Sequence, residues 1–381
     1  MKQRGHDFLR GWRLEKDKTT GGVSAACVTI AVAFAGMLAQ GAWASAISDA
    51  KDGPTGHEHA AAMAPAGHRD DNAAVHYLTA GLYYSKDVRS DMRAMEQGAT
   101  RDKWTDHDKF RKWVPRTGSD AIAEIMRAST IVRCDFAIHY DLGPEALLPH
   151  LGAMRTYARM LALDARVLLD EGDIHEAITR LAAGYKMAGH VAQDRLVISA
   201  LVSVSIFTTI DNMTAYFDKR GALDDDSKRT LLTAINSANE DDPFAVEASV
   251  AFEGAMMTGW LRDRAQTPEG VQEIREILST QNRTPAARSA AIERALASGG
   301  LLNTYITLFD RSYHDAAGVW NAPNPAEAVS AIKDRLHQGV YGPLVESLMP
   351  DVMRIYAQDK RARDKLRKRI AALGGDSEVI R

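Results

Sequence analysis

The stretch GPEALLPHLGAMRTYARMLALDARVLLDEGDIHEAITRLAAGYKMAGHVAQD, residues 143–194, decides the fold because both of its halves carry the same apolar pattern. Apolar residues recur at alternating steps of three and four, which places them on one face of an α-helix. In the first half they are Leu147, Leu151, Met154, Ala158, Leu161, Ala165 and Leu168, and in the second Ile174, Ala177, Leu181, Gly184, Ala188 and Val191. Between them, Gly172 suits the left-handed residue that ends a helix, and Asp173 suits the cap of the next. Two such helices joined by a short turn predict an antiparallel helical hairpin.

The acids and histidines of the hairpin are its candidates for chemistry. His175 and Glu176 fall outside the apolar face, so we expect them to face solvent. His190 and Asp194 are four residues apart and would share a face of a continuing helix. The alternative is a contact at the helix end, where a positively charged histidine suits the helix dipole.

The rest of the chain from residue 71 is also predicted to be helical. Residues 196–210, LVISALVSVSIFTTI, contain no charge, and this run is short for a bilayer span of about 20 residues, so we expect a buried central helix. Further helical patterns cover 70–84, 104–114, 119–132 with Ser119 as N-cap, 225–239, 242–264, 267–279, 284–298, 300–320 and the segment from 324. No strand pattern is found. The predicted fold is all-α, built from antiparallel helical hairpins in a repeat-like right-handed array or an irregular bundle.

The N-terminus predicts export. Residues 1–18 hold six basic and three acidic residues, and no charge follows from Thr19 to Ser48. A basic start, an apolar segment and Ala42-Trp43-Ala44 form a secretory signal peptide over residues 1–44, with an uncleaved membrane anchor as the alternative. The expected location is the periplasm or the cell exterior. Residues 45–70 read as a flexible tether before an all-α domain over 71–381. Cleavage would leave Cys134 as the single cysteine, without an internal disulfide.

Bulk composition and motifs exclude several classes of function. The 381 residues are 45% hydrophobic and carry a net charge of −3, which gives no general attraction to nucleic acid. The sequence has no Gly-x-Ser-x-Gly elbow, no phosphate-binding Gly-Lys-Ser/Thr loop, no His-Glu-x-x-His and no Cys-x-x-Cys. We therefore expect no cofactor, and the balance leans against an enzyme.

The hairpin resembles a tetratricopeptide-type repeat of about 34 residues. Small and apolar residues fall around the tight turn where that repeat has them: Ala165, Leu168, Gly172, Asp173, Ala177, Leu181 and Gly184. The longer order CDF…HYDLGPEALLPHL…ARMLALDARVLLDEGD, within residues 72–242, resembles a group of uncharacterised exported bacterial all-helical proteins. The resemblance implies an all-α, repeat-like fold outside the cytoplasm and supplies no activity.

The segment RCDFAIHYD is the best candidate for catalysis. It gathers Cys134, Asp135, His139, Tyr140 and Asp141, side chains that could form a nucleophile–base pair or a metal site. Together with His190 or Glu253 it would give a cell-envelope enzyme such as a hydrolase. The alternative is a packed loop with Cys134 and Phe136 buried. Glu247 and Glu253 are six apart on one predicted helix, hence on different faces, and are no obvious carboxylate pair.

Two further groups suggest binding. In the tether, His57, His59 and His68 with Met63 could bind copper, nickel or zinc, and a solvated spacer is the alternative. The tail QDKRARDKLRKRI could touch an anionic membrane surface or an acidic partner, or form a solvated helix end. Its basic residues are Lys360, Arg361, Arg363, Lys365, Arg367, Lys368 and Arg369.

Our main expectation is an exported helical-repeat-like binding or scaffold protein that holds a protein or envelope component on its surface. Fold alone does not fix function, so this expectation rests on association. A cell-envelope enzyme using the Cys134 segment and a metal-handling protein using the tether histidines are the alternatives.

Overall fold

The computed structural model describes residues 71–83, 88–114, 118–238, 241–280 and 286–376. The predicted signal peptide and tether lie outside these residues. In the described part every regular element is a helix and no strand is present, which confirms the all-α prediction.

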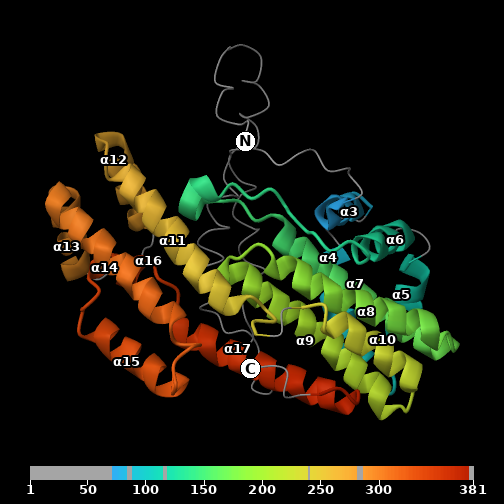
Figure 1. Cartoon of the computed structure of the whole chain (residues 1–381). Coiled ribbons are helices and arrows are strands. Elements are labelled where there is room, and N and C mark those ends of the chain that lie inside the picture. The colour runs from blue at the N-terminus through green and yellow to red at the C-terminus, as the bar shows by residue number, and fades with distance from the viewer. Residues whose placement is uncertain (1–70, 84–87, 115–117, 239–240, 281–285, 377–381) are drawn as a thin grey trace, which may run out of the picture. The chain divides into compact units, whose positions relative to one another are not determined.

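The predicted hairpin is formed by α7, His150–Glu171, and α8, Ile174–Ala192, which pack along each other (Figure 1). Gly172 ends α7 in the left-handed conformation with φ of 88°, as predicted. The side chain of Asp173 accepts a hydrogen bond from the Glu176 amide at 3.2 Å and caps α8, also as predicted. The inner members of both apolar faces are buried, whereas the outermost residues, Leu147 and Ile174, are exposed. Leu147 lies outside because α7 begins only after Pro149.

The predicted central helix is α9, Val197–Lys219, which packs on both α7 and α8. Among the described helices, it is long and apolar enough to cross a membrane by length and composition. However, 61% of its apolar window is buried inside the protein, as in the core helix of a packed bundle. Helix α10, Asp225–Ile235, covers the other side of α8 (Figure 1).

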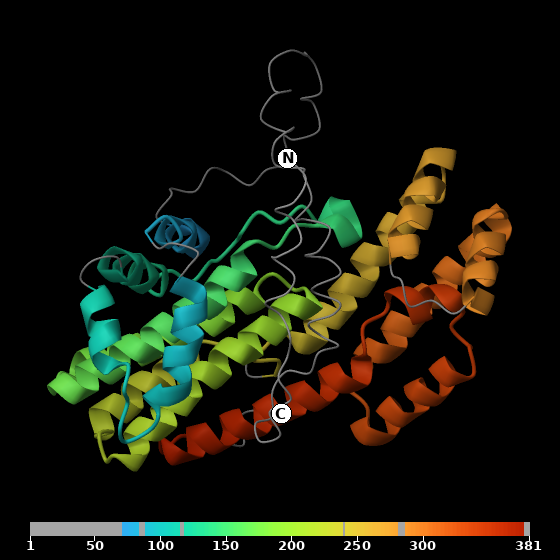
Figure 2. The same ribbon diagram turned by 180° about the vertical axis from the view of Figure 1, so that it is seen from behind.

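In the described residues, four α-helices precede the hairpin: α3, Ala73–Ala80; α4, Val88–Ala99; α5, His107–Trp113; and α6, Ser119–Ala128. Helix α3 packs on α6, while α4, α5 and α6 contact α7. Helix α4 lies across α7 and is seen in front in the view from behind (Figure 2). It was not predicted from sequence. Ser119 is the first residue of α6 and Gly118 precedes it as N-cap, so the prediction of Ser119 as N-cap was wrong.

Among the residues that the structure describes, seven helices follow α10. They are α11, Val246–Arg264; α12, Pro268–Thr280; α13, Ala286–Leu296; α14, Gly299–Ala317; α15, Pro325–His337; α16, Pro343–Leu348; and α17, Val352–Ala372. Helix α11 packs on α14 and reaches back to α9, and α17 also lies against α9. Both terminal helices of this group therefore attach it to the central helix α9.

The contact between α8 and α9 depends on a missing side chain. A Cβ atom added at Gly184 would lie 2.4 Å from Cδ1 of Ile210, well inside van der Waals contact. On the same helix, a Cβ atom at Gly189 would meet nothing within 4 Å. Gly184 is thus required by packing, whereas Gly189 is not.

We predict opposite effects for alanine at these two positions. Gly184→Ala should destabilise the protein by roughly 1–3 kcal/mol, because Ile210 and α9 must shift to admit the methyl group. Gly189→Ala should stabilise it by roughly 0.5–1 kcal/mol through helix propensity alone. Urea unfolding of both variants measures this difference, and equal effects would contradict the close approach of α8 and α9.

Candidate functional site

The densest group of buried polar side chains surrounds the turn between α8 and α9. Its centre is Asp194, which is 3% exposed. The carboxylate atom Oδ2 lies 2.8 Å from Nε2 of His150 and accepts a hydrogen bond from the Ser199 hydroxyl at 2.8 Å. The Tyr140 hydroxyl donates to the backbone carbonyl of Asp194, also at 2.8 Å. The Asp194 cluster consists of Asp194, His150, Ser199 and Tyr140.

His190 lies next to this cluster but has its own partner. Its Nδ1 is 2.8 Å from the hydroxyl of Tyr77, whose carbonyl accepts a hydrogen bond from Tyr157. Burial lowers the pKa of His190 to about 4, opposed by a hydrogen bond with the Ile131 backbone and assisted by the charge of Lys186. The ring is therefore neutral at pH 7, and its Nδ1 accepts a hydrogen bond from the Tyr77 hydroxyl. The expected shared face with Asp194 does not form, because α8 ends at Ala192.

Cys134 is buried beside the same turn. Its amide donates to Oε1 of Gln193 at 2.8 Å, and Nε2 of Gln193 donates to the carbonyl of Val132. Burial raises the pKa of the thiol well above its usual range, and the negative charges of Asp194 and Asp135 raise it further. Because the thiolate is the nucleophilic form, this environment suppresses nucleophilic chemistry at neutral pH.

Apart from Tyr140, the other polar residues of the Cys134 segment are exposed. Asp135 is exposed, pairs with Arg133 at 2.8 Å and accepts a hydrogen bond from the Ala137 amide. His139 and Asp141 form an exposed contact at 3.7 Å. Phe136 is partly buried and stacks on the His150 ring with centroids 3.9 Å apart. The segment thus has an inner side at Cys134 and an outer side at His139.

Glu253 caps α9 from another helix. Its Oε2 accepts a hydrogen bond from the amide of Val197, the first residue of α9, at 3.0 Å. This contact replaces a local cap, since Leu196 at the N-cap position has no polar side chain. Burial raises the pKa of Glu253, and the hydrogen bond from Val197 opposes that shift. A carboxylate at this position also suits the positive end of the α9 dipole.

The structure thus brings Cys134, His190 and Glu253 to the turn between α8 and α9, while Asp135 and His139 stay on the surface. Sequence reasoning missed His150 and Ser199. Ser199 stands in the charge-free segment 196–210, where a buried hydroxyl needs a partner, and that was the available signal. In a hydrolytic triad the serine donates to the histidine, whereas here Ser199 and His150 both bind the carboxylate. The arrangement satisfies buried polar groups and stabilises the turn.

The tether histidines His57, His59 and His68 lie outside the described residues. Within the part of the chain that is described, no three His, Cys, Asp or Glu side chains converge in a way that could hold a metal ion.

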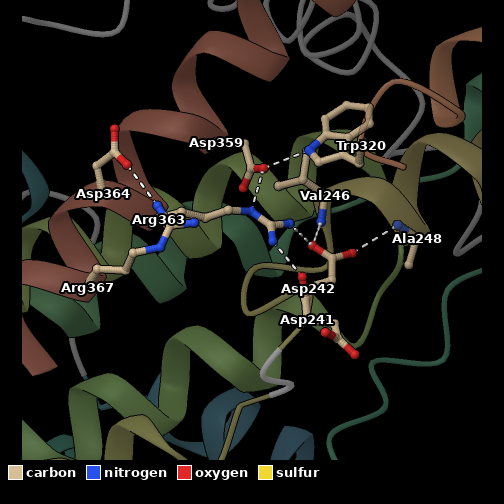
Figure 3. Close-up of polar contacts among 9 residues, drawn as sticks. All are labelled: Asp241, Asp242, Val246, Ala248, Trp320, Asp359, Arg363, Asp364 and Arg367. Atoms are coloured by element: carbon tan, nitrogen blue, oxygen red, sulfur yellow. Dashed lines mark hydrogen bonds and ion pairs between the residues drawn. The ribbon is translucent and has the colours of Figure 1, made fainter. Parts of the chain in front are cut away.

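The basic segment near the C-terminus is helix α17, and part of its charge is directed inward (Figure 3). Nε of Arg363 donates to Asp359 at 2.7 Å, and Nη2 donates to Asp242 at 2.9 Å. Asp242 also accepts hydrogen bonds from the amides of Val246 and Ala248, at 2.9 and 3.0 Å, in the first turn of α11. Arg363 therefore joins α17 to the start of α11.

A second arginine joins α17 to the central helices. Nε of Arg369 donates to Oδ1 of Asp211 on α9 at 2.6 Å, and Lys365 pairs with Oδ2 at 3.1 Å. Tyr185 on α8 donates to the same carboxylate at 3.4 Å. Burial lowers the pKa of Arg369, but the charge and hydrogen bond of Asp211 outweigh this and leave the pKa raised.

The predicted solvated helix end was therefore wrong for Arg363 and Arg369, which are both buried. Lys365 and Arg367 are half-buried and paired, the latter with Asp364. Lys360, Arg361 and Lys368 are exposed. A contact with an anionic surface would use these three residues.

Comparison of this chain with protein-family models, curated proteins and solved structures gives no match. Its function is therefore argued from its own geometry.

We predict that His190 makes stability depend on pH between about 6.5 and 4. Its pKa is about 4 in the folded protein against 6.5 for the free side chain, so the unfolded chain binds more protons in this window. The free energy of unfolding should therefore fall by roughly 2–3 kcal/mol between pH 7 and 4.5 through this residue. His190→Gln keeps an acceptor for Tyr77 but does not titrate, and should show a shallower loss in urea unfolding. His175→Gln, an exposed control on the same helix, should follow the wild type, and parallel profiles for both variants would refute the assignment.

Removing Arg363 should be costly. Arg363→Ala leaves the buried carboxylates of Asp242 and Asp359 without their cation, so we expect destabilisation of about 3–5 kcal/mol. Lys368→Ala, at an exposed position on the same helix, should change stability by less than about 0.5 kcal/mol. Guanidinium unfolding of the two variants tests this, and similar midpoints would show that the Arg363 contacts do not hold α17 in place.

Proposed function

We propose that the chain is an exported helical binding or scaffold protein that holds a partner protein through an apolar surface on α3. This surface consists of Val75, Leu78 and Leu82 and is called the α3 face. Leu78 is 55% exposed, and Leu82, in the turn that follows α3, is 83% exposed. The opposite side of α3 is buried at Ala73, Ala74, Tyr77 and Ala80. The helix therefore has apolar residues on two sides, and the core covers one of them.

Another exposed apolar residue lies near the start of α3. Val132, which is 86% exposed, lies in the irregular connection after α6. The amide of Ala73 donates to the carbonyl of Arg133 at 2.9 Å, and Asn72 exchanges two hydrogen bonds with the backbone of Asp135. These bonds fix the segment beside the start of α3. Single exposed apolar residues are ordinary, but several on one supported helix are typical of a docking surface.

The spacing of the α3 face favours an amphipathic helix of a partner protein as the occupant. Val75, Leu78 and Leu82 are separated by three and four residues, the spacing with which one helix packs into another. Helix α3 itself contains no lysine or arginine, whereas helices that lie on anionic membranes carry such residues on their polar face. A protein helix therefore suits this surface better than a membrane does.

The remaining parts of the proposal concern architecture and location. The α7–α8 hairpin and the packing of α9 on both helices support a tetratricopeptide-like arrangement, a type of fold that commonly presents partner-binding surfaces. We propose that the signal segment of residues 1–44 directs the chain to the periplasm or the cell exterior. The observation that best supports the proposed binding function is the exposure of Leu78 and Leu82 to solvent.

We predict that a designed amphipathic peptide with leucines at i, i+3 and i+7 binds the protein and that Leu78→Glu with Leu82→Glu weakens this binding at least about tenfold, because two carboxylates must then be desolvated. Fluorescence anisotropy of the labelled peptide measures affinity. Both residues are exposed, so circular dichroism should show an unchanged fold.

Val340→Glu replaces an exposed apolar residue elsewhere and should leave peptide binding unchanged. Equal affinity of the double variant and the wild type would reject the α3 face as the docking surface. The α3 face would also be rejected as a protein-docking surface if the wild type bound neutral lipid vesicles but not the peptide, and the double variant lost the vesicle binding.

A further inference from the structure

Helices α4, α7 and α9 are linked by polar contacts that fix how their residues lie opposite one another. Arg159 on α7 donates to Glu96 on α4 at 2.8 Å, and Thr209 on α9 donates to the other oxygen of Glu96 at 3.1 Å. Further along, Arg166 donates to the carbonyl of Ala99 at 2.7 Å and lies 4.4 Å from the Tyr216 ring centre. In each of the three helices, the residue in the second set of contacts comes later in the chain than the residue in the first set.

Two further arginines stand one helical turn before the contact between Arg159 and Glu96. Arg155 precedes Arg159 by one turn of α7, and Arg93 precedes Glu96 by one turn of α4. The pKa of Arg155 is lowered, first by partial loss of water around its guanidinium and then by the positive charges of Arg159 and Arg93. The three arginines therefore lie within electrostatic reach of one another.

This group of charges is not balanced by the protein. Within the described residues, Glu96 pairs with one of the three arginines, Arg159, at 2.8 Å. Neither Arg93 nor Arg155 has an acidic partner there, and both remain exposed to solvent. Like charges held this close repel each other unless an anion joins them.

We propose that Arg93 and Arg155 form a binding site for a phosphate-type oxyanion where α4 crosses α7, with Arg159 adding its positive charge. Guanidinium groups present paired N–H donors that match the oxygens of such an anion, and two of them can enclose it. The phosphate is either free in solution or the headgroup of a lipid. This site is made from other residues than the α3 face and does not depend on the proposed function.

Titration calorimetry of the full chain with inorganic phosphate tests the site. Arg155→Gln and Arg93→Gln should each weaken binding at least about tenfold, since each removes one of the two forks. Arg262→Gln is the matched control, because Arg262 is also an exposed arginine but pairs with Asp310 at 3.1 Å. It should bind phosphate like the wild type.

Charge reversal separates this role from a structural one. Arg155→Glu should abolish phosphate binding and raise the melting temperature in phosphate-free buffer of low ionic strength, because it replaces repulsion with attraction to Arg93. A structural role for Arg155 predicts the opposite shift, and a lower melting temperature of this variant would overturn the proposal.

Vesicles containing phosphatidic acid distinguish the two sources of phosphate. Binding of inorganic phosphate that is lost in Arg155→Gln assigns the site to a soluble phosphate compound. Vesicle binding lost in Arg155→Gln, without binding of inorganic phosphate, assigns it to a lipid headgroup. Binding of neither probe, or binding that survives in both glutamine variants, overturns the site.

Discussion

A carboxylate removed from water needs hydrogen bonds or a cation, and three aspartates buried among these helices obtain them from distant parts of the chain. Asp194 is bound by His150, Asp211 by Arg369 and Asp242 by Arg363. Each lies at or near a place where helices meet: the turn between α8 and α9, the contact of α9 with α17, and the start of α11. Helix packing supplies most of the buried area, but these carboxylates determine which helix ends are adjacent.

Two of these aspartates also lie next to strained backbone. Arg195 and Ala245 have φ of 53° and 52°, in the left-handed region that costs non-glycine residues roughly 1–2 kcal/mol. Arg195 follows Asp194 directly, and Ala245 precedes the Val246 amide that binds Asp242. Strain beside buried polar groups often marks a catalytic site. Here the carboxylates of Asp194 and Asp242 bind the adjoining helices through hydrogen bonds. These hydrogen bonds stabilise the buried negative charge and also hold the turn in its strained conformation.

The sequence predicts what depends on local periodicity. The α7–α8 hairpin, its Gly172 stop, its Asp173 cap and the buried α9 follow from spacing and composition, and the structure confirms them. Helix α4 escaped prediction although Met92, Met95 and Ala99 stand at helical spacing, because the run is short and mostly polar. The inward side of α17 was missed because charged residues dominate it from 359 to 369. Arg363 and Arg369 become recognisable only when their aspartates, more than a hundred residues away, are in place. For the same reason Cys134, His190 and Glu253 looked reactive in the sequence, whereas the fold gives each a structural partner.

The contrast between satisfied and unsatisfied groups is what separates structure from function in this protein. The basic helix α17 suggested a surface for binding, but Arg363 and Arg369 form ion pairs with the buried aspartates Asp242 and Asp211. The α3 face and the pair Arg93 and Arg155 differ, since the described chain provides the first with no apolar cover and the second with no carboxylate. An apolar helical face is best covered by another helix, and two neighbouring guanidinium groups are best joined by an oxyanion. Both proposals therefore rest on groups that the described chain leaves without an internal partner.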